Sequence, residues 1–214
     1  MQIDKLVLGL YENNSYVVRK NKNSPNCIII DTGLNTRPLI DFLNKKNLNP
    51  QVLILTHGHA DHIAGAALLR KNFDNIKVCI HKADSNMLTD PVSNLSSLAG
   101  TKITTSPADV LFDREEEIEY AGIRFRLIHT PGHTPGGICL YNKDDKILFS
   151  GDTLFTGSIG KSDFSGYDIQ KCFKQLVNNI REKLLILPDD TTVFPGHGQT
   201  TTIGEEKLHN PYLH

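Results

Sequence analysis

The 214-residue sequence contains no tryptophan, only two methionines and no hydrophobic run longer than a few residues. Stretches such as residues 52–55 fall far short of the ~20 residues needed to cross a bilayer, so we expect no membrane partner. The first ten residues lack the basic and apolar regions of a secretory signal peptide. The four cysteines, none in a C-x-x-C pair, predict no disulfide framework and favour a reducing, cytoplasmic location.

The sequence also lacks an excess of charge of either sign, since 23 Lys and Arg against 24 Asp and Glu leave a formal net charge of −1. This balance excludes a strongly basic nucleic-acid-binding protein, so we expect no nucleic acid partner. The length is roughly 1.4 times the ~150 residues of a typical domain, which predicts a single domain over residues 1–214. A hydrophobic content of 39% and a charged content of 22% are typical of a globular protein.

Strand-like and helix-like segments alternate along the chain without a linker or an internal repeat. The patterns predict strands at residues 6–10, 16–19, 27–30, 52–55, 78–80, 118–120, 123–128, 138–141, 147–149 and 192–194. They predict helices at residues 37–45, 61–71, 168–184 and 205–208. Residues 85–99 stay ambiguous, because Asp90-Pro91 interrupts a weakly helical pattern. Strands in meanders in both halves favour an α+β fold of two packed sheets with helices outside.

The segment Thr56-His57-Gly58-His59-Ala60-Asp61-His62 lies between a predicted strand and a predicted helix. By composition alone such a pattern would arise in about one of a thousand similar chains. In an extended stretch His57 and His59 point the same way, and Asp61 and His62 follow at a neighbouring point. Four such side chains suit two metal ions better than one, because a single tetrahedral ion could hardly use them all.

Three more residues of ligand type follow in loops at strand ends, where rigid scaffolds place chemistry. They are His133, Asp152 and His197. Alone, a histidine in a Pro-Gly turn is more often solvated, and an aspartate after a strand is commonly a cap. We expect these three residues to complete a metal coordination set together with the cluster at residues 57–62. The other histidines have no such company, and we assign them surface or structural roles: His81, His129, His209 and His214.

These seven residues, in this order, resemble the metallo-β-lactamase superfamily and, within it, the glyoxalase II group of thioester hydrolases. The resemblance extends to about Tyr212. It implies a four-layer αβ/βα sandwich of two mixed sheets with two metal ions at one edge. The implied ligands of the first ion are His57, His59 and His133. Those of the second are Asp61, His62 and His197, with Asp152 bridging both.

Lys161 lies where the glyoxalase II pattern has a lysine that contacts the glycine carboxylate of glutathione, although an ordinary surface lysine fits the sequence too. Two features depart from that pattern. Asp163 replaces an expected aromatic residue, and the long C-terminal helical domain is missing, as in the short bacterial members of the group. Asp31 resembles a carboxylate that orients a ligand histidine. A simple turn at a strand end is equally compatible with Asp31.

Five imidazoles and two carboxylates without a thiolate suit Zn²⁺, with iron or manganese possible. Two divalent ions, two carboxylates and a hydroxide leave a charge of about +1, which favours an anionic substrate. The ions would lower the pKa of a shared water toward ~7, and Asp61 would hold and orient that water. No general acid is evident outside the ligand set. A thiolate leaving group, whose thiol has a pKa of about 8.5, needs none, which favours a thioester such as S-lactoylglutathione.

Other activities of similar sequences stay open. A persulfide dioxygenase would bind a single Fe(II) through His57, His59 and Asp152 and would consume oxygen. A lactonase or another ester hydrolase is a further alternative, while the lack of a signal peptide disfavours a secreted β-lactamase. Flavodiiron-type reductases typically carry Glu at the position of His59, and a non-catalytic binding module would have lost a ligand. We expect a small-molecule substrate and a monomer or small homo-oligomer.

Overall fold

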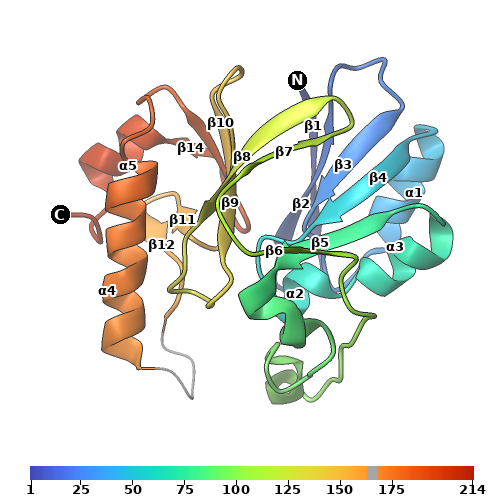
Figure 1. Ribbon diagram of the computed structural model, residues 1–214, viewed down its shortest axis with the longest axis horizontal. Coiled ribbons are helices and arrows are strands. Elements are labelled where there is room, and N and C mark those ends of the chain that lie inside the picture. The colour runs from blue at the N-terminus through green and yellow to red at the C-terminus, as the bar shows by residue number, and fades with distance from the viewer. Residues whose placement is uncertain (163–167) are drawn as a thin grey trace. The chain divides into compact units, whose positions relative to one another are not determined.

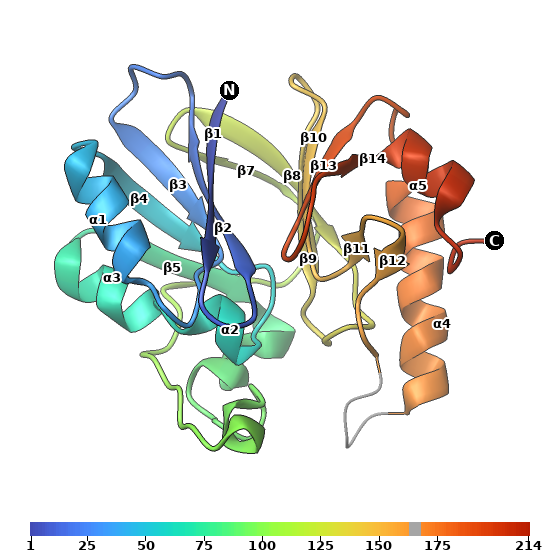
Figure 2. The ribbon, with the colours of Figure 1, turned by 180° about the vertical axis from the view of Figure 1, so that it is seen from behind.

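The computed structural model describes residues 1–162 and 168–214 of the chain. These residues form two compact units, one of Met1–Asp113 with Glu119–Arg124 and one of Arg114–Ile118 with Phe125–His214. Figures 1 and 2 show the elements of both units from opposite sides. Within the described residues, no helix is long and apolar enough to cross a membrane.

The first unit contains a six-stranded mixed sheet with its strands in chain order. The strands are β1 (Gln2–Leu8), β2 (Asn13–Arg19), β3 (Asn26–Ile30), β4 (Asn49–Ile54), β5 (Lys77–His81) and β6 (Val110–Phe112). The first three form an antiparallel meander, whereas β3 to β6 pair in parallel. Parallel neighbours need a crossover connection, and helices supply it between β3 and β4 and between β4 and β5.

Three short helices belong to this unit: α1 (Arg37–Lys45), α2 (Ala60–Ile63) and α3 (Ala66–Asn72). Pro38 lies in the first turn of α1, where the fixed φ of proline is compatible with the helix. Leu39, Ile40 and Leu43 of α1 are buried in one apolar cluster with alternate residues of the sheet, such as Ile29 and Leu53. Helices α1 and α3 lie along one face of this sheet (Figure 1).

The predicted helix 61–71 is interrupted, because α2 ends at Ile63 and α3 begins at Ala66. In a continuous helix the His62 carbonyl would accept from the backbone N–H of residue 66. Instead, it accepts from the backbone N–H and the hydroxyl of Thr32, at 2.9 and 2.8 Å. A Cβ at Gly65 would lie 2.5 Å from the Thr36 side chain, so only glycine allows this close approach. The ambiguous segment 85–99 overlaps two 3₁₀ helices, η1 (Lys82–Leu88) and η2 (Ser96–Ala99).

The second unit contains a mixed sheet of order β14–β13–β10–β9–β8–β7, in which β10 and β13 pair in parallel. Its strands are β7 (Glu117–Tyr120), β8 (Ile123–His129), β9 (Ile138–Asn142), β10 (Ile147–Gly151), β13 (Thr192–Pro195) and β14 (Thr201–Thr202). The tip of the β7–β8 hairpin, Glu119–Arg124, belongs to the first unit. A small separate sheet pairs β11 (Leu154–Phe155) with β12 (Ser158–Ile159). The helices α4 (Ile169–Asn179) and α5 (Ile203–His209) lie on the same side of the larger sheet (Figure 2).

The helix predicted at 168–184 is confirmed, with Asp168 as its cap. The Asp168 carboxylate accepts from the backbone N–H of Lys171 at 3.0 Å, which satisfies one N–H of the first turn. Helix α4 continues as a single π-helical segment, η3 (Ile180–Leu184). Leu176 and Ile180 recur at helical spacing and are buried against Val193 and other apolar residues of the sheet.

Three of the four cysteines are buried, and their thiols predict a pH dependence of stability. Burial raises the pKa of Cys27 to about 12 and the pKa of both Cys79 and Cys139 to about 11, against 9.0 when unperturbed. The unfolded chain therefore loses these protons at lower pH than the folded chain. We expect the free energy of unfolding to fall between about pH 9 and pH 11, by up to about 1.4 kcal/mol per pH unit for each thiol.

Urea unfolding at pH 8, 9 and 10 measures this slope. Cys27→Ala serves as the comparison, because it removes one titrating thiol and leaves Cys79 and Cys139 in place. For the variant, the free energy of unfolding should fall less steeply with pH, by about the contribution of one thiol. Equal slopes for the variant and the unmodified chain would show that the Cys27 thiol does not contribute.

Candidate metal centre

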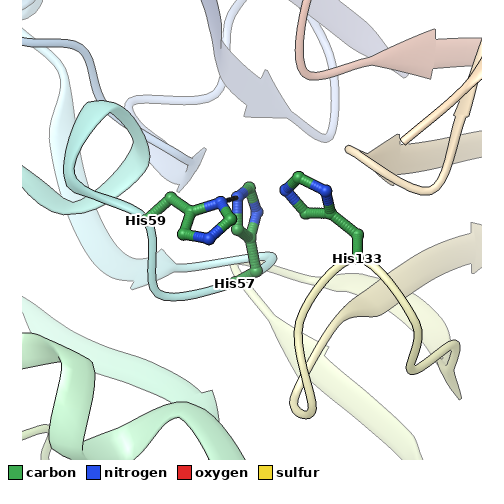
Figure 3. A group of neighbouring side chains, drawn as sticks. All are labelled: His57, His59 and His133. Carbon is green, nitrogen blue, oxygen red and sulfur yellow. Dashed lines mark hydrogen bonds between the residues drawn. The ribbon is translucent and has the colours of Figure 1, made fainter. Parts of the chain in front are cut away.

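His57 and His59 lie in the segment between β4 and α2, and both are buried. Nε2 of His57 and Nδ1 of His59 are 3.1 Å apart, and the rings meet edge to face (Figure 3). His59 has an extended backbone and immediately precedes α2, so the chain turns into the helix at this residue. The turn places Asp61 and His62 in the first turn of α2, with Asp61 Oδ2 3.8 Å from His62 Nε2.

Asp31 holds the ring of His62. Its Oδ2 accepts from His62 Nδ1 at 2.9 Å and from the Thr56 hydroxyl at 2.7 Å, while Oδ1 accepts from the Thr56 backbone N–H at 2.8 Å. Asp31 is buried and has a left-handed backbone with φ of 56°. Because Nδ1 of His62 carries the donated proton, the lone pair of Nε2 is available to an electrophile.

Asn13 also contacts His62, a contact that the sequence analysis missed. Its amide nitrogen lies 3.1 Å from Nδ1 and 3.0 Å from Nε2, so the amide packs on the face of the ring. Asn13 is fully buried at the start of β2, three residues before the start of the strand predicted at residues 16–19. The sequence feature that could have indicated a role for Asn13 is the polar run Asn13-Asn14-Ser15, which directly precedes an apolar strand.

The second unit gathers the other three candidate ligands. His133 lies in the loop between β8 and β9 (Figure 3). Asp152 directly follows β10, and His197 lies two residues after the end of β13. Asp152 Oδ2 is 3.6 Å from His133 Nε2 and 3.6 Å from His197 Nε2. Nδ1 of His133 donates to the Lys161 carbonyl at 2.7 Å, so Nε2 is the nitrogen that faces Asp152.

Close packing fixes the backbone of this second group. A Cβ at Gly160 would lie 1.8 Å from the Asp152 carbonyl oxygen and 3.2 Å from Cβ of His133. Only glycine therefore fits between these two residues. Since Lys161 is the next residue, the same packing sets the position of the carbonyl that orients His133.

The donor set fits metal ions. Two ligands at about 2.1 Å from one tetrahedral ion are about 3.4 Å apart, which is longer than a good hydrogen bond. The separations of 3.6 and 3.8 Å between carboxylate oxygens and imidazole nitrogens match this spacing. His62 and His133 each donate Nδ1–H to a protein oxygen, as metal-binding histidines usually do. All seven residues belong to groups of histidine and carboxylate side chains that could hold a metal ion.

Two mixed sheets with helices and a set of histidine and carboxylate ligands define a class of metal-dependent hydrolases. The chain belongs to the metallo-beta-lactamase superfamily, whose family profile matches residues 8–197. It is 35% identical to the hydroxyacylglutathione hydrolase GloC of Haemophilus influenzae, over 100% of this chain and 98% of that protein.

Solved structures agree with this assignment. The BLEG-1 B3 metallo-beta-lactamase matches with a TM-score of 0.92 and 39% identity, over 99% of both chains. TTHA1623, crystallised in a di-iron-bound form, matches with a TM-score of 0.81 and 32% identity, over 98% of this chain and 100% of that one. The predicted family and fold are confirmed, and the chain is a metal-dependent hydrolase of this superfamily.

The structure thus brings the predicted ligands together in two groups, one in each unit: His57, His59, Asp61 and His62, and His133, Asp152 and His197. Asp31 lies against His62, as an orienting carboxylate would. Lys161 contributes its backbone carbonyl to His133, and its side chain is exposed. Asp163 lies outside the described residues.

Proposed function

We propose that the seven residues form one centre for two divalent cations. His57, His59 and His133 would bind one ion, Asp61, His62 and His197 the other, and Asp152 both. The observation that carries the proposal is the position of Asp152 Oδ2, which is 3.6 Å from His133 and 3.6 Å from His197. The di-iron form of a protein 32% identical to this chain supports a paired site. Zinc is the expected metal, with iron or manganese as alternatives.

The proposed reaction is hydrolysis of a thioester, with S-lactoylglutathione or a related acyl-thiol as substrate. When bound, the ion pair supplies Lewis acidity and a water of lowered pKa. Asp61, which is partly exposed, orients that water. His62 is held by Asp31 and Asn13, so its ring stays in place during turnover. The similarity to GloC supports this substrate class.

A substrate panel tests the proposal. Protein reconstituted separately with zinc, iron and manganese would be given S-lactoylglutathione, other acyl-glutathiones and an ester lactone, with release of thiol or acid measured. We expect thiol release from the thioesters, and metal analysis should give two ions per chain. Failure of every metal-loaded form to cleave any thioester would contradict the proposed substrate. A single iron with oxygen uptake on a persulfide would select the dioxygenase alternative.

A β-lactamase is the second candidate, because a B3 metallo-beta-lactamase is 39% identical over 99% of this chain. The same panel should therefore contain a chromogenic β-lactam. Turnover of the β-lactam with a higher kcat/KM than any thioester would favour this second function. The metal centre would be the same in both cases, so only the substrate assignment would change.

We infer a reducing, cytoplasmic location and a monomer or small homo-oligomer. The location is supported by the four free cysteines, of which Cys27, Cys79 and Cys139 are buried. The near-neutral charge supports a small-molecule substrate rather than a nucleic acid. Size-exclusion chromatography with light scattering measures the oligomeric state.

Replacement of Asn13 by alanine is expected to weaken metal binding by about 10- to 100-fold, because outer partners of metal-binding histidines have effects of this size. The amide that packs on the His62 ring is lost, while all seven ligands remain. Isothermal titration with Zn²⁺ measures the affinities. Asn14→Ala is a matched control, since Asn14 is equally buried and hydrogen-bonds Tyr16 instead. Equal Zn²⁺ affinities for the two variants would show that Asn13 does not contribute to metal binding.

A further inference from the structure

The segment between β5 and β6, residues 82–109, contacts the chain that carries the first candidate ligands. It contains the 3₁₀ helices η1 and η2 and is drawn in shades of green in Figure 1. Strands β4 and β5 pair in parallel, so their carboxyl ends lie at the same edge of the sheet. The chain from His57 to Asp61 follows β4, and the β5–β6 segment follows β5. The sheet therefore brings the two segments together.

Two residues of this ligand-carrying chain, Gly58 and Ala60, alternate with the candidate ligands at positions 57, 59 and 61. The backbone N–H of Gly58 donates to Asp84 Oδ2 at 3.0 Å. The backbone N–H of Ala60 donates to the Asn94 carbonyl at 3.0 Å. A Cβ at Gly58 would lie 2.4 Å from the sulfur of Met87, so Met87 packs directly on this backbone. The β5–β6 segment therefore contacts the chain at the two positions that offer no ligand.

Hydrogen bonds within the β5–β6 segment fix the shape of this segment. The Asn94 side chain is fully buried, and its amide donates to the Met87 and Ile103 carbonyls at 2.8 and 2.9 Å. Its side-chain oxygen accepts from the Ser96 backbone N–H at 3.0 Å. These bonds join η1 to η2 and to the chain that returns toward β6, so the Asn94 carbonyl is held where it accepts from Ala60.

The Asp84 side chain supplies the carboxylate among these contacts. It is fully buried in η1, which begins directly after β5. His81, the last residue of β5, accepts from the Ala83 N–H at 3.3 Å through Nδ1 and so caps η1. A carboxylate is a stronger acceptor for a backbone N–H than a neutral carbonyl. Asp84 is therefore the acceptor that restrains the backbone between His57 and His59 most strongly.

We propose that Asp84 is a positioning residue of the metal centre. Through the Gly58 N–H it fixes the backbone between His57 and His59, so that the two imidazoles are in place before a cation binds. Asp84 acts through the backbone of the ligand-carrying chain and is not one of the seven candidate ligands. The proposal rests on the proposed function, because it assumes that His57 and His59 bind metal.

Isothermal titration with Zn²⁺ tests this role. Asp84→Ala should weaken Zn²⁺ binding by about 10- to 100-fold, the size of effect that outer partners of metal ligands have. Asp84→Asn keeps a side-chain oxygen for the Gly58 N–H and should retain most of the affinity. Asp109→Ala is the matched control, since Asp109 belongs to the same segment and accepts from the Val78 N–H at 2.7 Å, near the start of β5. Equal Zn²⁺ affinities for Asp84→Ala and Asp109→Ala would overturn the proposal.

The absorption spectrum of the Co²⁺-loaded protein separates positioning from general stability, because its visible bands depend on the arrangement of the ligands around the ion. The bands should change in Asp84→Ala and stay unchanged in Asp84→Asn and Asp109→Ala. Unchanged bands in a folded Asp84→Ala variant would contradict the positioning role.

Hydrogen exchange of the metal-free protein, resolved by NMR, gives a measurement that needs neither metal nor a variant. The Gly58 amide should exchange slowly in the unmodified protein, because its N–H is bonded to a buried carboxylate. Exchange at Gly58 should be at least about tenfold faster in Asp84→Ala and unchanged in Asp109→Ala. Fast exchange at Gly58 in the unmodified protein would overturn the proposal even if Asp84→Ala does not fold.

The outcomes separate this proposal from the proposed function. An unmodified protein that binds no Zn²⁺ contradicts the metal centre, whereas slow exchange at Gly58 that is lost in Asp84→Ala still supports the restraint that Asp84 places on this chain. Two bound ions with the same affinity in Asp84→Ala, together with fast exchange at Gly58, support the metal centre and overturn the role of Asp84.

Discussion

Asp152→Asn is expected to lose metal and activity together. The amide has the shape of the carboxylate but no negative charge, and only one of its two heteroatoms can bind a cation. Because the Oδ2 atom of Asp152 faces both His133 and His197, one substitution would affect both ions. We expect fewer than two ions per chain by elemental analysis. The kcat should fall by about three orders of magnitude, equivalent to about 4 kcal/mol.

Asp190→Asn provides the comparison. Asp190 is a carboxylate of the same unit that is largely exposed and pairs with Lys146, so its loss should leave metal content and kcat unchanged. Thermal unfolding of both metal-free variants shows whether each is folded. If folded Asp152→Asn keeps both ions and most of its rate, the bridging role is wrong.

Asp31→Ala is expected to lower the free energy of unfolding by about 3–5 kcal/mol, even without metal. The substitution leaves the Thr56 N–H and hydroxyl and the His62 Nδ1–H without the acceptor that they share. Each buried group left unsatisfied costs about 1–3 kcal/mol. Urea unfolding of the metal-free protein measures the loss, and metal titration should also show weaker binding.

Asp41→Ala is the surface control for this measurement. Asp41 forms an exposed ion pair with Arg37 one helical turn away, and such pairs contribute about 0.3–0.5 kcal/mol. Asp31→Asn keeps an acceptor for Thr56 but presents an amide N–H to His62, so its stability should lie between that of the alanine variant and that of the unmodified chain. A loss below about 1 kcal/mol for Asp31→Ala would contradict the structural role.

Local patterns predicted those elements whose cause is local. Helix α4 and its Asp168 cap follow from apolar residues at helical spacing and a side chain that reaches three residues along the chain. The continuous helix predicted at 61–71 is wrong for the opposite reason. Its break depends on Thr32, which is 30 residues from His62 and occupies the carbonyl that the helix would need.

The short strands β6 and β14 were missed because three or two residues carry too little alternation to be recognised. Strand β2 begins earlier than predicted, since its first residues Asn13, Asn14 and Ser15 are polar yet buried. A polar residue can occupy a buried strand when a distant partner satisfies it. For Ser15 that partner is the Asp31 carbonyl, 2.8 Å away.

The sequence by itself determined which side chains are candidate ligands, because residue type decides what can bind a metal and the cluster from His57 to His62 is contiguous. Only the tertiary structure decided how these ligands are held. The contacts of Asp31 with His62, of Asn13 with His62 and of the Lys161 carbonyl with His133 join residues 28 to 49 positions apart. Such contacts depend on how strands and loops meet in space, and no periodicity along the chain encodes them.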